Sequence, residues 1–418
     1  MKISLHKSQL EGNLAAPPSK SYTIRGLMAA ALAHGQSRLT DPLTSDDSEA
    51  AGEVLGQVGV DLSRSESSWG IRGGHLKEPV KDLFCRDSAA TMRFMAAICS
   101  LVPGRCRLVP GPSLAKRPIQ PMLEALGQLG VSCHAEGSAV VVDGGRLRGG
   151  TVEMTGDISS QFISALLLVS PLAEEGAVIR LTTPLASAPY IEMTLDTMNH
   201  FGIGVETSAD LRQFAISPQA YRPAGYRVEG DWSSASYFLA LGAAAGQISV
   251  SNLNRNSLQG DKIVLNLLKE MGARVDSNGD TVTVSRSGLM AITADLADSI
   301  DLLPTLAALA ALAEGRSVLN GISRARLKES NRVAAVAEGL GRMGISVTEA
   351  EDRLTIHGGR PRGAVIDSHG DHRIAMAFSI LGAAIGGTTI EGAECVAKTY
   401  PGFWQNLKKV GGRLEIDG

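Results

Sequence analysis

The chain has 418 residues, a formal net charge of −3, 44% apolar residues and only 4% aromatic residues. Proteins that bind duplex nucleic acid are usually strongly basic, so this balance argues against nucleic acid as a partner. No apolar signal segment opens the chain, and the apolar run at 302–313 contains Pro304 and is too short to cross a bilayer, so we expect a cytoplasmic protein without a membrane partner. Five cysteines without a CxxC pair are typical of reduced thiols in that compartment.

Taken from its N-terminus, the chain predicts one leading strand over 1–18 and then six copies of a unit of about seventy residues. Each copy ends in a helix, a glycine and two short strands, because glycine reaches the left-handed conformation that closes a helix at little cost. In the segment 267–284, the helix ends at Gly272 and the strands span 273–276 and 281–285. Six such units predict two domains of three units each. The stop glycines are separated by 71, 72, 70, 72 and 67 residues and are Gly59, Gly130, Gly202, Gly272, Gly344 and Gly411.

Every unit begins with a polar helix start that is followed by an Ala-rich apolar run. Ser and Asp side chains accept hydrogen bonds from first-turn amides, so these starts predict the N-termini of buried helices. Structural caps alone would account for any single start, but the starts also carry the chain's least ordinary residues. They are marked by Ser21, Ser88, Ser160, Ser234, Asp301 and His372.

The first start, SKSYTIRGL at 19, places Lys20, Ser21 and Arg25 in the first two turns of a helix. A cation at a helix N-terminus opposes the helix dipole, so Lys20 is locally unfavourable there. A bound anion would reverse this by gathering the helix amides, Lys20 and Arg25 around one charge. The alternative is an exposed lysine, and the anion site is the favoured interpretation.

Two later stretches of the first half also suit anionic or hydroxylated ligands. AKRPIQP at 115 places Arg117 before Pro118 and a helix, although an isolated arginine is more often a solvated surface residue. TGDISSQF at 155 opens a helix with Ser159, Ser160 and Gln161, neutral groups that suit a phosphate or a sugar hydroxyl. The simpler interpretation of that start is a cap with a spare serine.

The second half carries acid–base candidates among its cations. Asp301 opens an almost wholly apolar helix, either as a structural cap or as the acceptor of a proton from a bound hydroxyl. In KESNR at 328, Lys328 and Arg332 are four apart, so on a helix they share a face with Glu329 between them. Such a run is usually a solvated, ion-paired face, but it also describes a phosphate site that contains a general acid or base.

The last start, SHGDHRI at 368, places Asp371, His372 and Arg373 at the opening of the sixth helix. A lone histidine is more often structural than catalytic, whereas Arg373 at a helix start suggests anion binding. Lys398, in CVAKTY, would by itself be taken for a surface lysine. The chain has no HExxH or CxxC motif and no Walker loop, so neither a metal site nor a kinase is indicated.

In order and spacing, the motifs SKSYTIR, RPI, DISSQF, KESNR and DHR resemble the EPSP synthase family over nearly the whole chain. The resemblance implies an α/β fold, the two-domain inside-out α/β barrel with six βαβαββ repeats, three per domain. The domains would be 19–226 and the combination of 1–18 with 227–418. The implied enzyme transfers the enolpyruvyl group of phosphoenolpyruvate (PEP) to the 5-hydroxyl of shikimate-3-phosphate and releases phosphate. It would serve the shikimate pathway to chorismate and the aromatic amino acids, as a monomer without a cofactor or metal.

The resemblance also implies roles for individual residues, in a cleft between the two domains where the six helix starts converge. Asp301 would act as the base and Glu329 as the proton donor, with Lys20 assisting, although either carboxylate could act in both steps. The implied PEP-binding residues are Lys20, Ala89, Arg117, Gln161, Arg332, Arg373 and Lys398. The implied shikimate-3-phosphate-binding residues are Lys20, Ser21, Arg25, Ser159, Ser160, Gln161, Ser187, Tyr190, Asp301 and Lys328.

Several positions depart from the family pattern, among them Ala90 for a threonine and Asn331 for the aspartate of KESDR. Ala89 stands where the family has a glycine close to the bound enolpyruvyl donor, and its methyl group would narrow a tight anion pocket. We therefore predict an enzyme that uses PEP but tolerates glyphosate, the longer inhibitor known for the family. Ala188 replaces a lysine and Arg324 an asparagine, so the contacts of those two positions with shikimate-3-phosphate are left open.

Two alternatives remain at this stage. One is the related enolpyruvyl transferase that acts on UDP-N-acetylglucosamine, although that family opens with Lys-Asn where this chain has Lys20-Ser21. Its loop cysteine also has no counterpart in the settings of Cys106 and Cys133. The other alternative is a non-catalytic anion-binding protein of the same fold.

Overall fold

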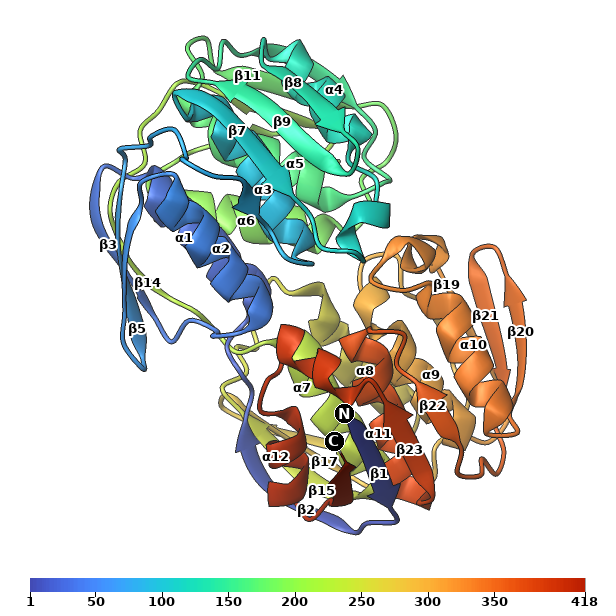
Figure 1. The fold of residues 1–418 in the computed structure, drawn as a ribbon. Coiled ribbons are helices and arrows are strands. Elements are labelled where there is room, and N and C mark those ends of the chain that lie inside the picture. The colour runs from blue at the N-terminus through green and yellow to red at the C-terminus, as the bar shows by residue number, and fades with distance from the viewer. Residues whose placement is uncertain (418) are drawn as a thin grey trace. The chain divides into compact units, whose positions relative to one another are not determined.

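In the computed structural model, which describes residues 1–417, the chain forms two compact units (Figure 1). The inserted unit is Pro18–Glu229, and the terminal unit combines Met1–Pro17 with Gly230–Gly418. These limits lie close to the boundaries expected after residues 18 and 226, and the independence of the two units as folding domains stays a prediction. Each unit has a hydrophobic core of its own.

Each unit holds three four-stranded sheets that share one topology. In the sheet β10-β11-β13-β12, the first two strands are parallel, and the last two form an antiparallel hairpin whose later strand pairs with β11. The strands of the inserted unit are β3 (Gly35–Thr40), β4 (Asp61–Arg64), β5 (Ser68–Gly73), β6 (Leu83–Phe84), β7 (Gly104–Val109), β8 (Ser132–Glu136), β9 (Ala139–Gly144), β10 (Gly150–Met154), β11 (Ala177–Leu181), β12 (Glu206–Thr207), β13 (Gln213–Ile216) and β14 (Gly225–Arg227). Those of the terminal unit are β1 (Lys2–His6), β2 (Leu10–Ala15), β15 (Gly246–Ser251), β16 (Arg274–Asn278), β17 (Thr281–Ser285), β18 (Thr293–Asp295), β19 (Arg316–Asn320), β20 (Ser346–Ala350), β21 (Arg353–His357), β22 (Val365–Asp367), β23 (Thr388–Glu391) and β24 (Arg413–Asp417).

The N-terminal segment contributes two strands, so the predicted single strand over 1–18 is wrong. The chain turns between His6 and Leu10, and the two strands join different sheets. Strand β1 lies antiparallel between β23 and β24, whereas β2 pairs in parallel with β15. The sixth and fourth repeats are therefore completed by residues from the chain start, which explains why the two segments of the terminal unit form one body. In the inserted unit, β14 completes the first repeat by pairing with β3.

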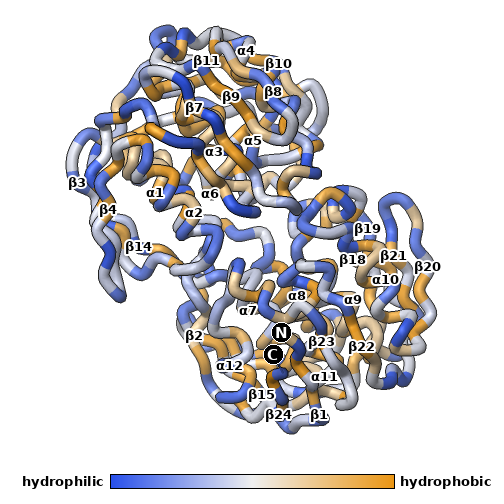
Figure 2. The backbone as a smooth tube through the Cα atoms, in the orientation of Figure 1, coloured by the Kyte–Doolittle hydropathy of each residue, from blue (hydrophilic) through white to orange (hydrophobic). Residues whose placement is uncertain are grey.

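In each unit, one helix of every repeat is buried in the interior and the other is partly exposed (Figure 1). The helix after the first strand of each repeat is the more deeply buried one, and α7 is buried along its whole length. Figure 2 shows hydrophobic residues along such interior helices, for example α5. None of the described helices is both long and apolar enough to cross a membrane. The helices are α1 (Lys20–Leu32), α2 (Asp46–Gln57), α3 (Ala89–Ile98), α4 (Gln120–Gln128), α5 (Ser160–Val169), α6 (Ala188–His200), α7 (Trp232–Ala245), α8 (Val264–Glu270), α9 (Leu303–Leu312), α10 (Arg332–Arg342), α11 (His372–Ile385) and α12 (Phe403–Lys409).

The predicted helix ends are confirmed. All six stop glycines have positive φ, from 82° at Gly202 to 98° at Gly59, which is the conformation that closes a helix. The hairpin predicted for 267–284 is also present, with Asn278 opposite Thr281 in the β16–β17 pair. At five of the six starts a side chain accepts a first-turn amide, and these N-caps are Ser19, Ser88, Ser159, Asp231 and Asp371.

Candidate functional site

Asp301 lies at the centre of a buried charge cluster in the terminal unit. Its carboxylate accepts hydrogen bonds from Arg332 Nη1 at 2.6 Å and Arg373 Nη2 at 3.0 Å, and Lys328 Nζ lies 3.5 Å from its Oδ1. Burial alone would raise the pKa of Asp301, but Arg373, Lys328 and Arg332 together hold that pKa well below its usual range. At neutral pH the cluster is therefore built around an ionised carboxylate.

Of the two interpretations of Asp301, the structural cap is wrong. The residue lies inside a short 3-10 turn, Ile300–Leu302, which precedes α9, and the N-cap position of that turn is Ser299. The carboxylate instead receives guanidinium groups from α10 and α11. This fifth start thus differs from the other five because no side-chain hydrogen bond caps its N-terminus.

Arg332 joins three carboxylates although it is only 1% exposed. Its Nε donates to Asp371 Oδ2 at 2.7 Å and its Nη2 to Glu329 Oε2 at 2.5 Å, beside the bond to Asp301. Burial alone would lower the pKa of Arg332, but Asp371, Glu329 and Asp301 outweigh burial and raise that pKa. Loss of this arginine would leave several buried carboxylates without their common partner.

The KESNR motif is not one helix, contrary to the predicted i,i+4 pair. Lys328 follows a 3-10 turn, Ser323–Leu327, and Asn331 caps α10, so that Arg332 is the first residue of that helix. Asparagine is a strong N-cap residue, which explains why the helix begins after it. Lys328 and Arg332 nevertheless both approach Asp301, one from the loop and one from the helix.

Arg373, the second residue of α11, is held from several sides and is 8% exposed. Its backbone N–H donates to the cap residue Asp371 at 2.9 Å. Its Nη1 donates to Ser233 Oγ and, at 3.2 Å, to Tyr237 OH, and both of these residues belong to α7. Together with Asp301, these contacts fix the guanidinium on both sides.

Lys398 belongs to the same cluster and is not the surface lysine that its motif alone suggests. It ends the 3-10 turn Ala393–Lys398, its side chain is 11% exposed, and its Nζ lies 3.9 Å from Glu329 Oε1. The structure thus brings together the site residues predicted in the terminal unit, which are Asp301, Lys328, Glu329, Arg332, Arg373 and Lys398.

Lys20 opens α1 as predicted, but the protein itself places an anion beside it. Its Nζ lies 2.8 Å from Oδ2 of Asp47, a buried residue in the first turn of α2. Sequence reasoning missed Asp47. The available signal was the acidic helix start that follows Ser45, which is typical of a capped first turn.

Arg25 is buried, and neutral groups hold its guanidinium. Its Nε donates to Thr194 Oγ1 at 2.8 Å, Nη1 to Ser21 O at 3.1 Å and Nη2 to Tyr190 O at 3.0 Å. The same group lies 5.5 Å from the ring centre of Phe94 and 5.7 Å from that of Tyr190. Burial lowers the pKa of Arg25 to about 10, and no carboxylate among the described residues counters this effect. Such a cation favours an anionic ligand.

Arg93, which sequence analysis did not single out, connects two of the predicted residues. Its Nη1 donates to Ser159 Oγ at 3.1 Å and to Gln161 Oε1 at 2.7 Å, and its Nη2 donates to Pro118 O at 3.1 Å. Arg93 therefore ties the start of α5 to the segment that carries Arg117. An arginine inside an apolar, Ala-rich helix is itself unusual, and this was the signal that could have identified it.

Ala89 is the first residue of α3 and is 5% exposed. Two positions earlier, Asp87 Oδ1 accepts the backbone N–H groups of Ser113 and Leu114, both at 2.9 Å. This carboxylate fixes the loop that leads to Arg117. The start of α3 and the arginine segment are therefore coupled through Asp87.

The remaining predicted residues of the inserted unit also lie at helix starts. Ser160 is the first residue of α5 and is 7% exposed. Ser187 precedes α6 and has a φ of 58°, a left-handed conformation that is uncommon for serine and often marks a functional position. Tyr190, in the first turn of α6, contacts Arg25 through both its carbonyl oxygen and its ring.

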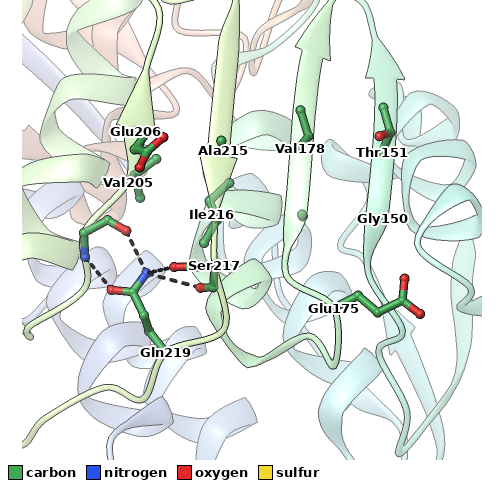
Figure 3. Close-up of a pocket in the computed structure, with 12 residues that line it drawn as sticks. Gly150, Thr151, Glu175, Val178, Val205, Glu206, Ala215, Ile216, Ser217 and Gln219 are labelled. Atoms are coloured by element: carbon green, nitrogen blue, oxygen red, sulfur yellow. Dashed lines mark hydrogen bonds between the residues drawn. The ribbon is translucent and has the colours of Figure 1, made fainter.

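A separate pocket of about 600 Å³ lies along the strand ends of the sheet β10-β11-β13-β12 (Figure 3). Within it, the side chain of Gln219 accepts the backbone N–H of Gly204 at 2.9 Å and donates to the carbonyl oxygen of Gly204 at 2.8 Å. The described residues that line it include Glu175 and Glu206 but no lysine or arginine. This pocket does not suit an anionic ligand, in contrast to the clusters around Arg25 and Asp301.

Comparison with protein families gives one match that spans most of the chain. A family model described as EPSP synthase (3-phosphoshikimate 1-carboxyvinyltransferase) matches residues 5–407. A protein named 3-phosphoshikimate 1-carboxyvinyltransferase from Dehalococcoides mccartyi is 53% identical over 419 residues, with 100% of both chains covered. A protein of the same name from Methanothermobacter thermautotrophicus is 39% identical, again with 100% of both chains covered.

Solved structures show the same fold. An EPSP synthase from Acinetobacter baumannii superposes with a TM-score of 0.84 at 27% identity and covers 100% of both chains. The enolpyruvyl transferase NikO from Streptomyces tendae, at 19% identity, has a TM-score of 0.80 and covers 99% of this chain and 98% of its own. The predicted fold class, the two-domain inside-out α/β barrel, is thereby confirmed.

Proposed function

The chain belongs to the EPSP synthase family, the 3-phosphoshikimate 1-carboxyvinyltransferases, and from this premise we propose how its residues carry out the transfer. It is a transferase of the shikimate pathway, which supplies the aromatic amino acids. In the proposed reaction, the 5-hydroxyl oxygen of shikimate-3-phosphate adds to C2 of PEP while a proton adds to C3. The tetrahedral adduct then loses the C3 proton and phosphate, so the net change is one enolpyruvyl transfer.

The single observation that carries the proposal is the position of Asp301 between the guanidinium groups of Arg332 and Arg373. Addition and elimination need proton transfer and stabilisation of charge, and little else. A carboxylate can move the proton, and the two arginines can bind the phosphate and carboxylate of PEP. Both guanidinium groups lie within hydrogen-bond distance of the Asp301 carboxylate.

Binding of PEP would also make Asp301 a better base. In the ligand-free protein, Arg373, Lys328 and Arg332 hold the pKa of Asp301 low, and a carboxylate with a low pKa is a weak base. PEP competes for Arg332 and Arg373, so its binding weakens the bonds that stabilise the Asp301 carboxylate. Asp301 then accepts the hydroxyl proton, while Glu329 delivers the C3 proton.

Shikimate-3-phosphate is assigned to the inserted unit. Its phosphate would compensate the buried charge of Arg25 together with Lys20 and Ser21, because a guanidinium bonds most strongly to an anionic acceptor. The hydroxyl-bearing starts at Ser159 and Ser187 suit the remaining oxygens of the ligand. The two clusters are proposed to act on the same pair of substrates, so variants in either should impair one reaction.

The methyl group of Ala89 supports the proposal that this enzyme tolerates glyphosate. Ala89 stands at the buried first position of α3, next to the loop that Asp87 fixes before Arg117. A methyl group at a tight anion site removes space that a compact ligand such as PEP does not need. A longer inhibitor would lose contacts or clash there.

An assay for phosphate release from PEP tests the proposal. We expect release only when shikimate-3-phosphate is also present, and none with UDP-N-acetylglucosamine in its place. Release that needs UDP-N-acetylglucosamine would support the related transferase instead. Binding of both anions without release, and without any effect of Asp301→Asn, would support a non-catalytic protein. A matched control is Glu338→Gln, which alters an exposed carboxylate on α10.

The cytoplasmic location and the monomeric state complete the proposal. Size-exclusion chromatography with light scattering should give the mass of one chain, 43.7 kDa, with and without ligands. A stable dimer at micromolar concentration would contradict the monomer.

A further inference from the structure

Arg93 is a buried arginine of α3 to which the proposed chemistry gives no role. It is 3% exposed, and its side chain reaches the start of α5, the helix that packs beside α3 (Figure 1). Its guanidinium lies over the ring of Phe162, with Cζ 4.7 Å from the ring centre, and its Nη2 donates to the carbonyl oxygen of Pro118 at 3.1 Å. These two contacts fix the plane of the guanidinium, so its other donors have defined directions.

The nitrogen Nη1 of Arg93 donates to the two polar side chains that open α5. One bond, of 2.7 Å, ends at Gln161 Oε1, and the other, of 3.1 Å, ends at Ser159 Oγ. A guanidinium has N–H donors and no acceptor, so both oxygens must act as acceptors here. The amide of Gln161 is therefore held with its oxygen toward Arg93 and its NH2 group at the opposite end.

The hydroxyl group of Ser159 is constrained in the same way. Its oxygen accepts from Arg93 and, at 3.4 Å, from the backbone N–H of Gln161, because Ser159 is the N-cap of α5. A hydroxyl oxygen has two acceptor lone pairs, and these two bonds occupy both of them. The hydroxyl proton remains, so Ser159 can meet a ligand only as a donor. Without Arg93, both side chains could present either a donor or an acceptor to a ligand.

We propose that Arg93 is a positioning residue, which acts through Ser159 and Gln161 to make the start of α5 a set of donors for acceptor oxygens of an anionic substrate. This rests on the proposed function, in which the start of α5 binds shikimate-3-phosphate. The first-turn amides of α5 and the positive end of its dipole favour the same kind of ligand. A phosphate oxygen satisfies such donors, whereas a ligand group that must itself donate does not.

The first test is Arg93→Met, which keeps an unbranched apolar side chain beside Phe162 but removes every donor. Because the amide of Gln161 is then free to turn, we expect shikimate-3-phosphate to bind about tenfold more weakly, with kcat within about threefold. Isothermal titration calorimetry without PEP measures the dissociation constant, and steady-state phosphate release measures kcat. Arg105→Met alters an exposed arginine of β7 and should change neither value.

The second test repeats Arg93→Met in a Gln161→Ala background. Gln161→Ala alone should weaken binding about tenfold. No amide then remains to be oriented, so adding Arg93→Met should weaken binding only about threefold further, through Ser159. A factor for Arg93→Met that is the same in both backgrounds would overturn the inference, because the arginine would then act on the fold or on the ligand itself.

The third test, Gln161→Glu, leaves Arg93 in place and reverses the polarity of the end that faces the ligand. A glutamate can still accept from Arg93 and pairs with its charge, so the melting temperature should equal or exceed that of the unmodified protein. It has no N–H to offer and would repel an anion, so shikimate-3-phosphate should bind about 100-fold more weakly. These opposite responses of stability and binding provide the test if Arg93→Met does not fold. Unchanged binding by Gln161→Glu would overturn the donor role.

The outcomes separate this inference from the proposed function. If the unmodified enzyme releases no phosphate from PEP in the presence of shikimate-3-phosphate, the proposed function is wrong. If Gln161→Ala leaves binding unchanged, the assignment of the start of α5 to the substrate is wrong. If Gln161→Ala weakens binding but Arg93→Met does not, only the role of Arg93 is wrong.

Discussion

The cluster around Asp301 and the cluster around Arg25 surround their buried arginines with opposite kinds of partner, carboxylates in the first and neutral groups in the second. Arg332 is 1% exposed and contacts three carboxylates, whereas Arg25 is 3% exposed and donates to a hydroxyl and two carbonyl oxygens. The electrostatic consequences differ in sign. The pKa of Arg332 is raised by its partners, and the pKa of Arg25 is lowered by burial.

This difference indicates that the two clusters have different chemical roles, proton transfer in one and anion binding in the other. A site that transfers protons needs carboxylates. In the protein interior these carboxylates stay ionised only when cations pair with them, as in the terminal unit. A site that only binds a dianion is better without carboxylates, because they would repel the ligand, and Arg25 meets that description. Lys20, which pairs with Asp47, is the exception in the inserted unit, and it is also the residue of that unit to which the family resemblance assigns a part in the chemistry.

The largest expected effect is on catalysis in the terminal unit. Asp301→Asn removes the proposed base, so kcat should fall about 10³-fold, within the usual contribution of general acid–base catalysis. KM for PEP should stay the same or fall, because the competing carboxylate charge on Arg332 and Arg373 is lost. Steady-state phosphate release measures both constants, with Glu338→Gln as the control. A kcat within tenfold of the unmodified value would remove Asp301 from the mechanism.

The second effect is on stability and contrasts the two arginines directly. Arg332→Met leaves several buried carboxylates without their cation, a change that typically lowers the free energy of unfolding by about 3–5 kcal/mol. It should lower the melting temperature of the ligand-free protein by roughly 10 °C. Arg25→Met removes a buried charge that has no carboxylate partner, so its melting temperature should stay within a few degrees or rise. Circular dichroism melts compare the two, and equal losses of stability would refute the contrast.

The same Arg25→Met protein should bind shikimate-3-phosphate poorly. We expect an increase of about 100-fold in KM for that substrate, as for loss of a buried charge-assisted contact, and a much smaller change in KM for PEP. If instead KM for PEP alone increases, the assignment of the two substrates to the two clusters is reversed.

A smaller effect is expected at Ala89. Ala89→Gly should strengthen inhibition by glyphosate at least tenfold and leave KM for PEP within threefold, because one methyl group in a pocket is worth roughly 10- to 200-fold in discrimination. Inhibition curves at fixed PEP measure this, and a melting curve checks for loss of helix stability. Tight, PEP-competitive inhibition of the unmodified enzyme would dispose of the proposed tolerance.

The smallest effect is the pH dependence of stability. The pKa of Asp301 is lower in the folded protein than in the unfolded chain, so its stabilisation is complete above about pH 4 and is lost as pH falls below that value. The difference in melting temperature between the unmodified protein and Asp301→Asn should therefore shrink from pH 7 to pH 3. The difference for Arg25→Met should lack this acid dependence, since Arg25 stays charged. A constant Asp301→Asn difference would mean that its charge does not matter for stability.

Much of the fold was predictable because its signals are local. A glycine ends a helix and a serine or aspartate begins one through bonds within a single turn, and six regular copies made the repeat visible. The second strand at the N-terminus was missed because β1 and β2 pair with strands at the far end of the chain and with β15, and their pairing leaves no local mark. The predicted helix over KESNR is wrong because Asn331 is a strong N-cap residue and a new helix begins after it. The four-residue spacing of Lys328 and Arg332 is a weaker signal than this cap.

The sequence predicted the cations of the candidate site better than it predicted the residues that contact those cations. The motif resemblance supplied Asp301, Glu329 and the arginines, and the structure places those of the terminal unit in one cluster. Asp47, Arg93 and Ser233 were not foreseen as functional. Their contacts join residues 27, 66 and 140 positions apart, distances over which no sequence pattern specifies a hydrogen bond.

The sequence by itself determined where five of the six buried helices begin and where the six glycine-ended helices stop, since those choices depend on residues within one turn of each other. Only the tertiary structure decided that Asp301 would serve as the shared acceptor of two guanidinium groups and that Arg25 would be buried among neutral groups. Both outcomes follow from packing between distant segments, which sets the distance between charges and the access of water, and these two quantities govern whether a carboxylate stays ionised and a cation needs a ligand.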